Sequence, residues 1–286
     1  MKQGRLLIDS GLTKQNASLK IRNIQCKTII SKSKLYGIDY SINPYTGCQH
    51  NCVYCYARSM FERWEQNRKW GKFVDIKLNA PAILQKQLQR IQKGSILISS
   101  VTDPYQPIEK ESRLTRQLLS LLSKKKFQIS ILTKSALVTR DIGIFQENPD
   151  WEIGLTLTTA DDTIRALMEP HASSTEERFK ALRILVNAGV KTYAFLGPLL
   201  PFISEDSTLE LLDTLSDLNV PHVLVDRLNI KQGSLEQIVS KLVNKMPCST
   251  SQFLAACKQN SNYYFNLKRL IEKESSLRGI KTYFCY

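Results

Sequence analysis

Hydrophobic and polar positions alternate along the chain with two different periods. Apolar, β-branched runs of strand length alternate with segments whose apolar positions recur at helical spacing. The predicted strands span residues 39–44, 95–101, 127–133, 152–158, 191–197 and 220–227. The predicted helices span residues 114–122, 176–188, 208–218 and 235–243, and a shorter one begins at residues 139–141. Because neighbouring parallel strands need a crossover connection, this alternation predicts a parallel sheet covered by helices.

The number of strand–helix units sets the fold class. About six units are too few for a closed eight-fold barrel, so we predict an α/β protein with a partial (β/α)6 TIM-type barrel. No linker composition interrupts the pattern, and a single domain is expected. We place an N-terminal lead-in at residues 1–37, the partial barrel at 38–247, and a C-terminal helical extension packed on the barrel at 248–286, ending in the apolar stretch "IKTYFCY".

Polar and reactive residues follow the predicted strands where each strand ends. The loop "INPYTGCQHNCVYCYAR" follows the first strand, "TDPYQ" follows the second, and Lys134 follows the third. Ligands of parallel α/β sheets gather at the carboxyl ends of the strands. The sequence therefore predicts one ligand site formed by these loops.

Three cysteines in the first loop, Cys48, Cys52 and Cys55, have C-x-x-x-C-x-x-C spacing. Structural zinc needs four ligands, usually from two paired motifs, and no second pair stands at a suitable distance. His50 lies between the first two cysteines, where it would strain a four-point cage. Three thiolates suit a cubane iron–sulfur cluster, because they hold three irons and leave the fourth iron open for another ligand.

Composition and charge indicate the cellular location and the partners that we expect. The 286 residues include seven cysteines and no apolar run near the length of a membrane span, so we expect a cytoplasmic protein without disulfides and without a membrane partner. The formal net charge is +14. Such an excess favours a polyanionic partner, DNA or RNA first, although a basic solvated surface is the plainer explanation.

Four stretches in order resemble one known family: "DYSINPYTGCQHNCVYCYAR", "TDPYQPIEKESRLTRQLL", "ILTKSALVTRDI" and "EPHASSTEERFKAL". They are similar to radical S-adenosylmethionine (radical SAM) enzymes, and more narrowly to the spore photoproduct lyase-like, DNA repair photolyase-related branch. The resemblance covers residues 40–227, about two thirds of the chain.

The resemblance implies a [4Fe-4S] cluster whose open iron binds S-adenosyl-L-methionine. One electron from a flavodoxin- or ferredoxin-type donor would cleave that cofactor to a 5′-deoxyadenosyl radical, which abstracts hydrogen from a substrate, here a nucleic acid or another molecule. The implied metal ligands are Cys48, Cys52 and Cys55. Implied catalytic residues are Tyr54 and Tyr56, Tyr56 also lying near the adenine, and the implied cofactor-binding residues are Thr102, Asp103, Lys134, Thr156 and Thr158. We expect a monomer.

One position departs from the pattern of this branch. Spore photoproduct lyases have a hydrogen-donating cysteine just before the hydroxyl–carboxylate pair, whereas this chain has Val101. The thiols that remain as donors are Cys26, Cys248, Cys257 and Cys285, each of which is more simply explained as a structural cysteine. The competing hypothesis is a non-enzymatic iron–sulfur protein that binds nucleic acid on the same scaffold.

Overall fold

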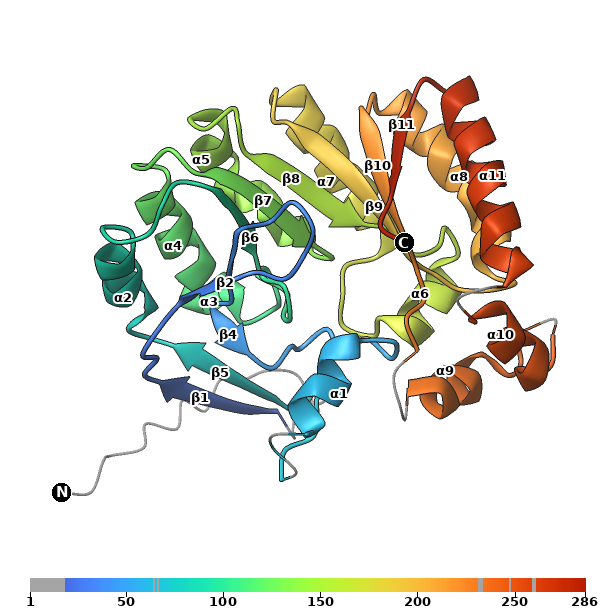
Figure 1. Cartoon of the computed structure of the whole chain (residues 1–286), viewed down its shortest axis with the longest axis horizontal. Coiled ribbons are helices and arrows are strands. Elements are labelled where there is room, and N and C mark those ends of the chain that lie inside the picture. The colour runs from blue at the N-terminus through green and yellow to red at the C-terminus, as the bar shows by residue number, and fades with distance from the viewer. Residues whose placement is uncertain (1–18, 64, 66, 231–233, 247, 259–260) are drawn as a thin grey trace.

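The computed structural model describes residues 19–63, 65, 67–230, 234–246, 248–258 and 261–286. An eight-stranded open sheet dominates it, in the order β11-β10-β9-β8-β7-β6-β3-β2, with helices on its outer face (Figure 1). The strands are β2 (Ile30–Lys32), β3 (Tyr40–Ile42), β6 (Ser95–Ile98), β7 (Gln128–Thr133), β8 (Glu152–Thr156), β9 (Thr192–Leu199), β10 (His222–Arg227) and β11 (Lys281–Phe284).

The pairing confirms the predicted partial barrel. All neighbours from β3 to β11 are parallel, and only β2 pairs antiparallel, with β3. The two edge strands, β2 and β11, are not paired with each other, so the barrel is open. In β7, the buried residues Ile129, Ile131 and Thr133 alternate with the half-buried residues Ser130 and Leu132, as expected for successive side chains on opposite faces of a sheet.

A second, smaller sheet was not predicted. It has the order β1-β5-β4 and is built from β1 (Lys20–Ile24), β4 (Tyr45–Thr46) and β5 (Phe73–Lys77), which lie beneath the first half of the large sheet in Figure 1. Part of the predicted lead-in therefore forms β1 and β2, and residues 1–18 of it lie outside the described residues. The small sheet supports the cysteine loop, which leaves directly from β4.

The helices confirm the main sequence signals. They are α1 (Tyr56–Glu62), α2 (Ala80–Gln87), α3 (Glu109–Ser112), α4 (Leu114–Leu122), η2 (Ala136–Asp141), α5 (Ile142–Gln146), α6 (Asp162–Met168), α7 (Thr175–Asn187), α8 (Ser204–Asp217), α9 (Ser234–Leu242), α10 (Thr250–Ala256) and α11 (Asn262–Leu277). Helix α7 begins with a capping box from Ser174 and Glu177, and Gly189 follows its end with φ +72°.

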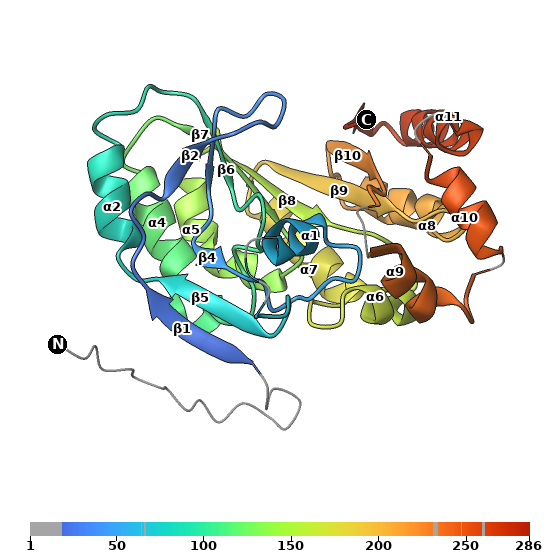
Figure 2. The ribbon, with the colours of Figure 1, turned by 60° about the horizontal axis from the view of Figure 1, so that its bottom comes forward.

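The C-terminal elements flank the second half of the sheet. Helices α8 and α11 pack side by side, α9 packs against α6, and α10 packs against α11 (Figures 1 and 2). Within the part of the chain that is described, no helix is both long and apolar enough to cross a membrane.

Candidate functional site

The cysteine loop runs from β4 to α1, at the carboxyl edge of the large sheet. Gly47 opens it with φ +85°, and a Cβ at this position would lie 2.4 Å from the carbonyl oxygen of Phe73, so only glycine fits. Cys48 and Cys52 are buried, and Cys55 is half-buried at the N-cap of α1. The loop thus carries its three thiols on a backbone whose entry and exit are fixed by neighbouring strands and a helix.

Two buried glutamines lock this loop against the loop that follows β6. Gln106 accepts a hydrogen bond from the Gln49 backbone N–H (2.8 Å) and donates one to the Gly47 carbonyl (3.3 Å). In return, the Gln49 side chain accepts a bond from the Ile108 N–H at 2.6 Å. On the other side, the Val53 N–H donates to the Met168 carbonyl at 2.8 Å. The sequence analysis missed both glutamines, because no spacing rule distinguishes them from surface amides.

The three thiols lie in an environment that favours their neutral form. Burial raises the pKa of Cys48 to about 12, and burial also raises the pKa values of Cys52 and Cys55. The nearby Lys134 ammonium opposes this effect at Cys52 and Cys55. Buried thiolates without a cation are unfavourable, so a group that carries positive charge and binds thiolate would complete the site.

The three loop thiols can be compared with the needs of a single ion and of a cluster. Among the residues that the structure describes, no three histidine, cysteine or carboxylate side chains converge closely enough to hold one metal ion. A tetrahedral zinc site requires such convergence. A cubane does not, because each thiolate binds a different iron.

Asp103, predicted to bind the cofactor, is buried and already holds several protein groups. Its carboxylate accepts hydrogen bonds from the Thr133 hydroxyl (2.6 Å) and from the backbone N–H groups of Lys134 (2.8 Å) and Tyr105 (2.9 Å). The His50 Nδ1 atom lies 3.3 Å from Asp103 Oδ2. Burial alone would raise the Asp103 pKa, but His50, the Thr133 hydroxyl and the Lys134 N–H lower it to about 2. Asp103 therefore links the loops after β6 and β7 as a permanent carboxylate.

The other half of the predicted hydroxyl–carboxylate pair, Thr102, is only loosely held. Its hydroxyl donates to Ser99 Oγ at 3.4 Å, which is long for an O–H···O bond. Thr102 is half-buried. Its hydroxyl therefore has more freedom than Asp103 to contact a ligand.

A buried carboxylate that the sequence analysis did not single out, Glu169, organises the opposite side of the cysteine loop. It forms an ion pair with Arg178, and both side chains are fully buried. The Tyr54 hydroxyl donates to Glu169 Oε1, as does the Thr158 hydroxyl at 2.7 Å. Burial alone would raise the Glu169 pKa, but Arg178, Lys134 and the Tyr54 hydroxyl lower it to about 2.

Lys134 and Thr156 are the predicted ligand-binding groups with spare hydrogen-bonding capacity. Lys134 Nζ lies 5.7 Å from the centre of the Tyr54 ring. Burial would lower the Lys134 pKa, but the net effect of Cys52 and Glu169 raises it, so the ammonium stays charged. The Thr156 hydroxyl is buried and has no hydrogen-bond partner among the described residues. Such an unpaired donor is unusual in a protein interior, and this hydroxyl is therefore available to a ligand.

Tyr56 lies at the mouth of the partial barrel. Its side chain is 43% exposed, and its hydroxyl donates to the Ser100 carbonyl in the loop after β6. Burial raises the pKa of Tyr56 to about 12, with smaller contributions from Cys55 and from Asp226 near the carboxyl end of β10. The pKa of Asp226 is itself raised to about 6 by burial. Asp226 thus joins the predicted residues at the mouth, although no motif indicated it.

Val101, at the position where the resemblance implies a hydrogen-donating cysteine, packs against the apolar cluster of Cys48, Ala57 and Trp70. All seven cysteines are free thiols. Of the four outside the loop, Cys285 is exposed, and its backbone N–H donates to the Val225 carbonyl at 2.9 Å. The other three are half-buried.

Comparison with protein families gives one domain match. The family model described as the Radical SAM superfamily matches residues 42–215. This range begins just before the cysteine loop and ends within α8. It includes all ten site residues that the sequence analysis named.

Two curated proteins and one solved structure are also similar. The uncharacterized protein MJ0683 of Methanocaldococcus jannaschii is 41% identical over 186 residues, 65% of this chain and 70% of that protein. The spore photoproduct lyase of Clostridium acetobutylicum is 26% identical over 168 residues, 56% of this chain and 46% of that protein. A mutant spore photoproduct lyase with bound AdoMet and dinucleoside spore photoproduct has a TM-score of 0.70 at 15% identity, covering 99% of this chain and 88% of that one. At this identity the structural match establishes the fold.

Proposed function

The chain belongs to the radical SAM superfamily, and from this premise we propose that Cys48, Cys52 and Cys55 hold a [4Fe-4S] cluster at the mouth of the partial barrel. When bound, such a cluster supplies an electron that cleaves S-adenosyl-L-methionine to a 5′-deoxyadenosyl radical. The observation that supports this most directly is the buried three-thiol loop, which faces the charged ammonium of Lys134. Membership of this family identifies the chain as an enzyme, which argues against the non-enzymatic alternative.

The chain's own residues would bind and orient the cofactor. Lys134 supplies a charged ammonium for the methionine carboxylate. Thr156 supplies its unpaired hydroxyl, and Thr102 supplies a second hydroxyl from the loop after β6. Asp103 positions these groups by holding the Lys134 backbone, and the one lone pair that its three accepted hydrogen bonds leave on Oδ2 would be available to the methionine ammonium.

The two tyrosines on either side of Cys55, Tyr54 and Tyr56, would have different roles. Tyr54 is held by Glu169 and Thr158, so its ring forms a fixed wall beside Lys134. Tyr56 is more exposed and would contact the adenine at the mouth. Thr158 would act mainly through its bond to Glu169.

We propose a nucleic acid as the substrate and a flavodoxin- or ferredoxin-type protein as the electron donor. The net charge of +14 supports the first proposal, as does the dinucleoside lesion bound by the structurally similar lyase. Val101 has no S–H bond, so we do not expect this chain to return hydrogen to a product radical by the route of those lyases. The reaction on the nucleic acid would therefore differ from repair of that lesion.

Anaerobic reconstitution with iron and sulfide tests the cluster proposal. We expect about four irons and four sulfides per chain, and an electron paramagnetic resonance signal that shifts when S-adenosyl-L-methionine is added. The shift would report a ligand on an open iron. The proposal would be contradicted by a reduced cluster whose signal does not change when the cofactor is added, or by a preparation that binds zinc alone.

A further inference from the structure

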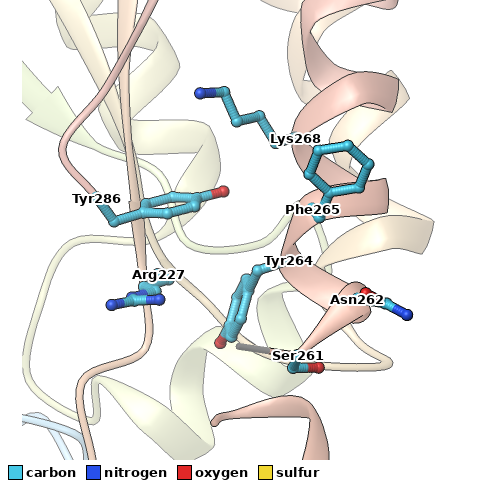
Figure 3. A pocket seen from close by; sticks show the side chains of 7 residues that line it. All are labelled: Arg227, Ser261, Asn262, Tyr264, Phe265, Lys268 and Tyr286. Atoms are coloured by element: carbon cyan, nitrogen blue, oxygen red, sulfur yellow. The ribbon is translucent and has the colours of Figure 1, made fainter. Parts of the chain in front are cut away.

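A groove of about 490 Å³ lies between helix α11 and the carboxyl ends of β10 and β11, outside the site described above (Figure 3). It is lined by Arg227, Ser261, Asn262, Tyr264, Phe265, Lys268 and Tyr286. Its volume lies within the range of small-molecule sites. None of these residues belongs to the cofactor site, so the groove is a separate site.

The groove combines cations with aromatic rings. Arg227 Cζ lies 5.4 Å from the centre of the Tyr286 ring, and Lys268 Nζ lies 4.8 Å from the centre of the Phe284 ring. The seven lining residues include no acidic side chain, although the carboxylates of Asp226 and Glu272 act on Tyr286 from outside the lining. Glu272 approaches Lys268 at 3.8 Å, but both side chains are well exposed and such a pair is weak. The lining therefore favours an anionic ligand with a flat, stackable group.

The two adjacent aromatic residues of α11 have different roles. Tyr264 is 2% exposed, and its hydroxyl donates to the Leu199 carbonyl (3.1 Å) and accepts from the Leu228 N–H (3.2 Å). Tyr264 is therefore a structural residue. Phe265 is 61% exposed and extends beside the groove in Figure 3. An exposed ring at the edge of a basic groove is suited to stack on a planar ligand.

The groove lies at the same edge of the sheet as the cysteine loop. Arg227 ends β10, and Tyr286 follows β11. The cysteine loop lies at this carboxyl edge of the large sheet, so a polymer held in the groove would extend along the edge toward the cofactor site.

We propose that this groove binds a nucleotide unit of a single-stranded nucleic acid, with its base stacked on Phe265 and its phosphates contacted by Arg227 and Lys268. The inference rests on the proposed nucleic-acid substrate and adds where a part of the strand outside the reaction centre is held. Stacking on an aromatic ring is tolerant of sequence, so the groove would contribute affinity and not base selectivity.

Binding of fluorescein-labelled oligo-dT and oligo-U to the full chain, followed by fluorescence anisotropy without cofactor, tests the groove. Phe265→Ala should raise Kd by about 5- to 150-fold, the range for losing one stacked base. Lys268→Ala should reduce the slope of log Kd against log salt by about 0.7, the value for one phosphate contact on a single strand. Phe265→Ala should leave that slope unchanged.

Matched control variants lie on the same helix. Leu277 is 72% exposed, and the Lys273 side chain is 73% exposed; neither lines the groove. Leu277→Ala and Lys273→Ala should bind as the unaltered protein does. The proposal is overturned if Phe265→Ala and Lys268→Ala bind normally, if the controls weaken binding equally, or if a free mononucleotide binds while the oligonucleotides do not. Because these experiments need no cluster, a failure of radical chemistry would leave their outcome unchanged.

Discussion

The hydroxyl of Tyr54, one residue before the last loop cysteine, donates a hydrogen bond to the buried carboxylate of Glu169. Glu169 lies 115 residues further along the chain and is paired with Arg178 on α7. Arg178 in turn donates to the Thr156 carbonyl at the end of β8 (2.9 Å) and to the Ser173 carbonyl (2.9 Å). The position of the cysteine loop is thus tied to β8 and α7 through one charged pair.

Glu169→Gln should destabilise the protein strongly. The change leaves the Arg178 guanidinium buried without its anionic partner, and breaking a buried ion pair in this way costs about 3–5 kcal/mol. Equilibrium urea unfolding of the cofactor-free protein would measure the loss. Glu176→Gln is the matched control, because Glu176 forms an exposed pair with Lys180 on α7. This change should lower the free energy of unfolding by less than about 1 kcal/mol. Equal effects of both changes would contradict this view of the network.

The lowered pKa of Glu169 also predicts that the protein loses stability as the pH falls. The pKa of Glu169 is lowered to about 2 in the folded state, against about 4.3 in an unfolded chain. A lowered pKa contributes stability that is present above the unfolded value and is lost as pH falls through the folded value. Between about pH 5 and pH 2, the free energy of unfolding should therefore fall more steeply in the unaltered protein than in Glu169→Gln. Parallel curves would show that Glu169 does not contribute.

Thr156→Val and Thr158→Val should have opposite effects on stability. The Thr156 hydroxyl is buried without a partner, so its removal should leave the cofactor-free protein as stable or slightly more stable. The Thr158 hydroxyl donates to Glu169, and its loss should cost about 1.5–3 kcal/mol, the range for a bond to a charged group.

S-adenosyl-L-methionine binding separates the two threonines further. If Thr156 contacts the cofactor, Thr156→Val should raise its Kd about 2- to 10-fold in the reconstituted protein, as calorimetry can measure. A destabilised Thr156→Val protein with normal cofactor affinity would argue for a purely structural hydroxyl.

Gln106→Ala should loosen the cysteine loop. The change leaves the buried Gln49 N–H and Gly47 carbonyl without partners, at about 1–3 kcal/mol for each group. We expect less iron per chain after reconstitution and lower unfolding free energy. Gln117→Ala, on the exposed face of α4, is the control and should load iron normally. Normal iron content of Gln106→Ala after reconstitution would show that the hydrogen bonds of Gln106 are not needed to form the iron site.

The strand–helix alternation was predictable because buried parallel strands are continuous apolar runs. Helix α4 begins and ends where its pattern predicts, at residues 114 and 122. The small sheet was missed because β1 (KIRNI) and β5 (FVDIK) are short and interrupted by charge. Asp75 in β5 is neutralised by Arg68, a partner that no local pattern reveals.

The site was predictable only where close spacing carries the chemistry. The three cysteines within eight residues indicated a metal centre, whereas Glu169 and Arg178 are separated from them by more than a hundred residues and resemble ordinary helix-flanking charges. No sequence motif identified Asp226 either, since its position at the mouth depends on the curvature of the sheet. Long-range pairing of buried charges is set by packing, which periodicity does not encode.

The most direct test of the account is formation of 5′-deoxyadenosine by anaerobically reconstituted, dithionite-reduced protein supplied with S-adenosyl-L-methionine. Chromatography and mass spectrometry would quantify the product for the unaltered chain and for Cys52→Ala. We expect 5′-deoxyadenosine from the unaltered chain and none above background from Cys52→Ala. Absence of the product from unaltered protein with a full complement of iron and sulfide, or equal amounts from both proteins, would contradict this expectation.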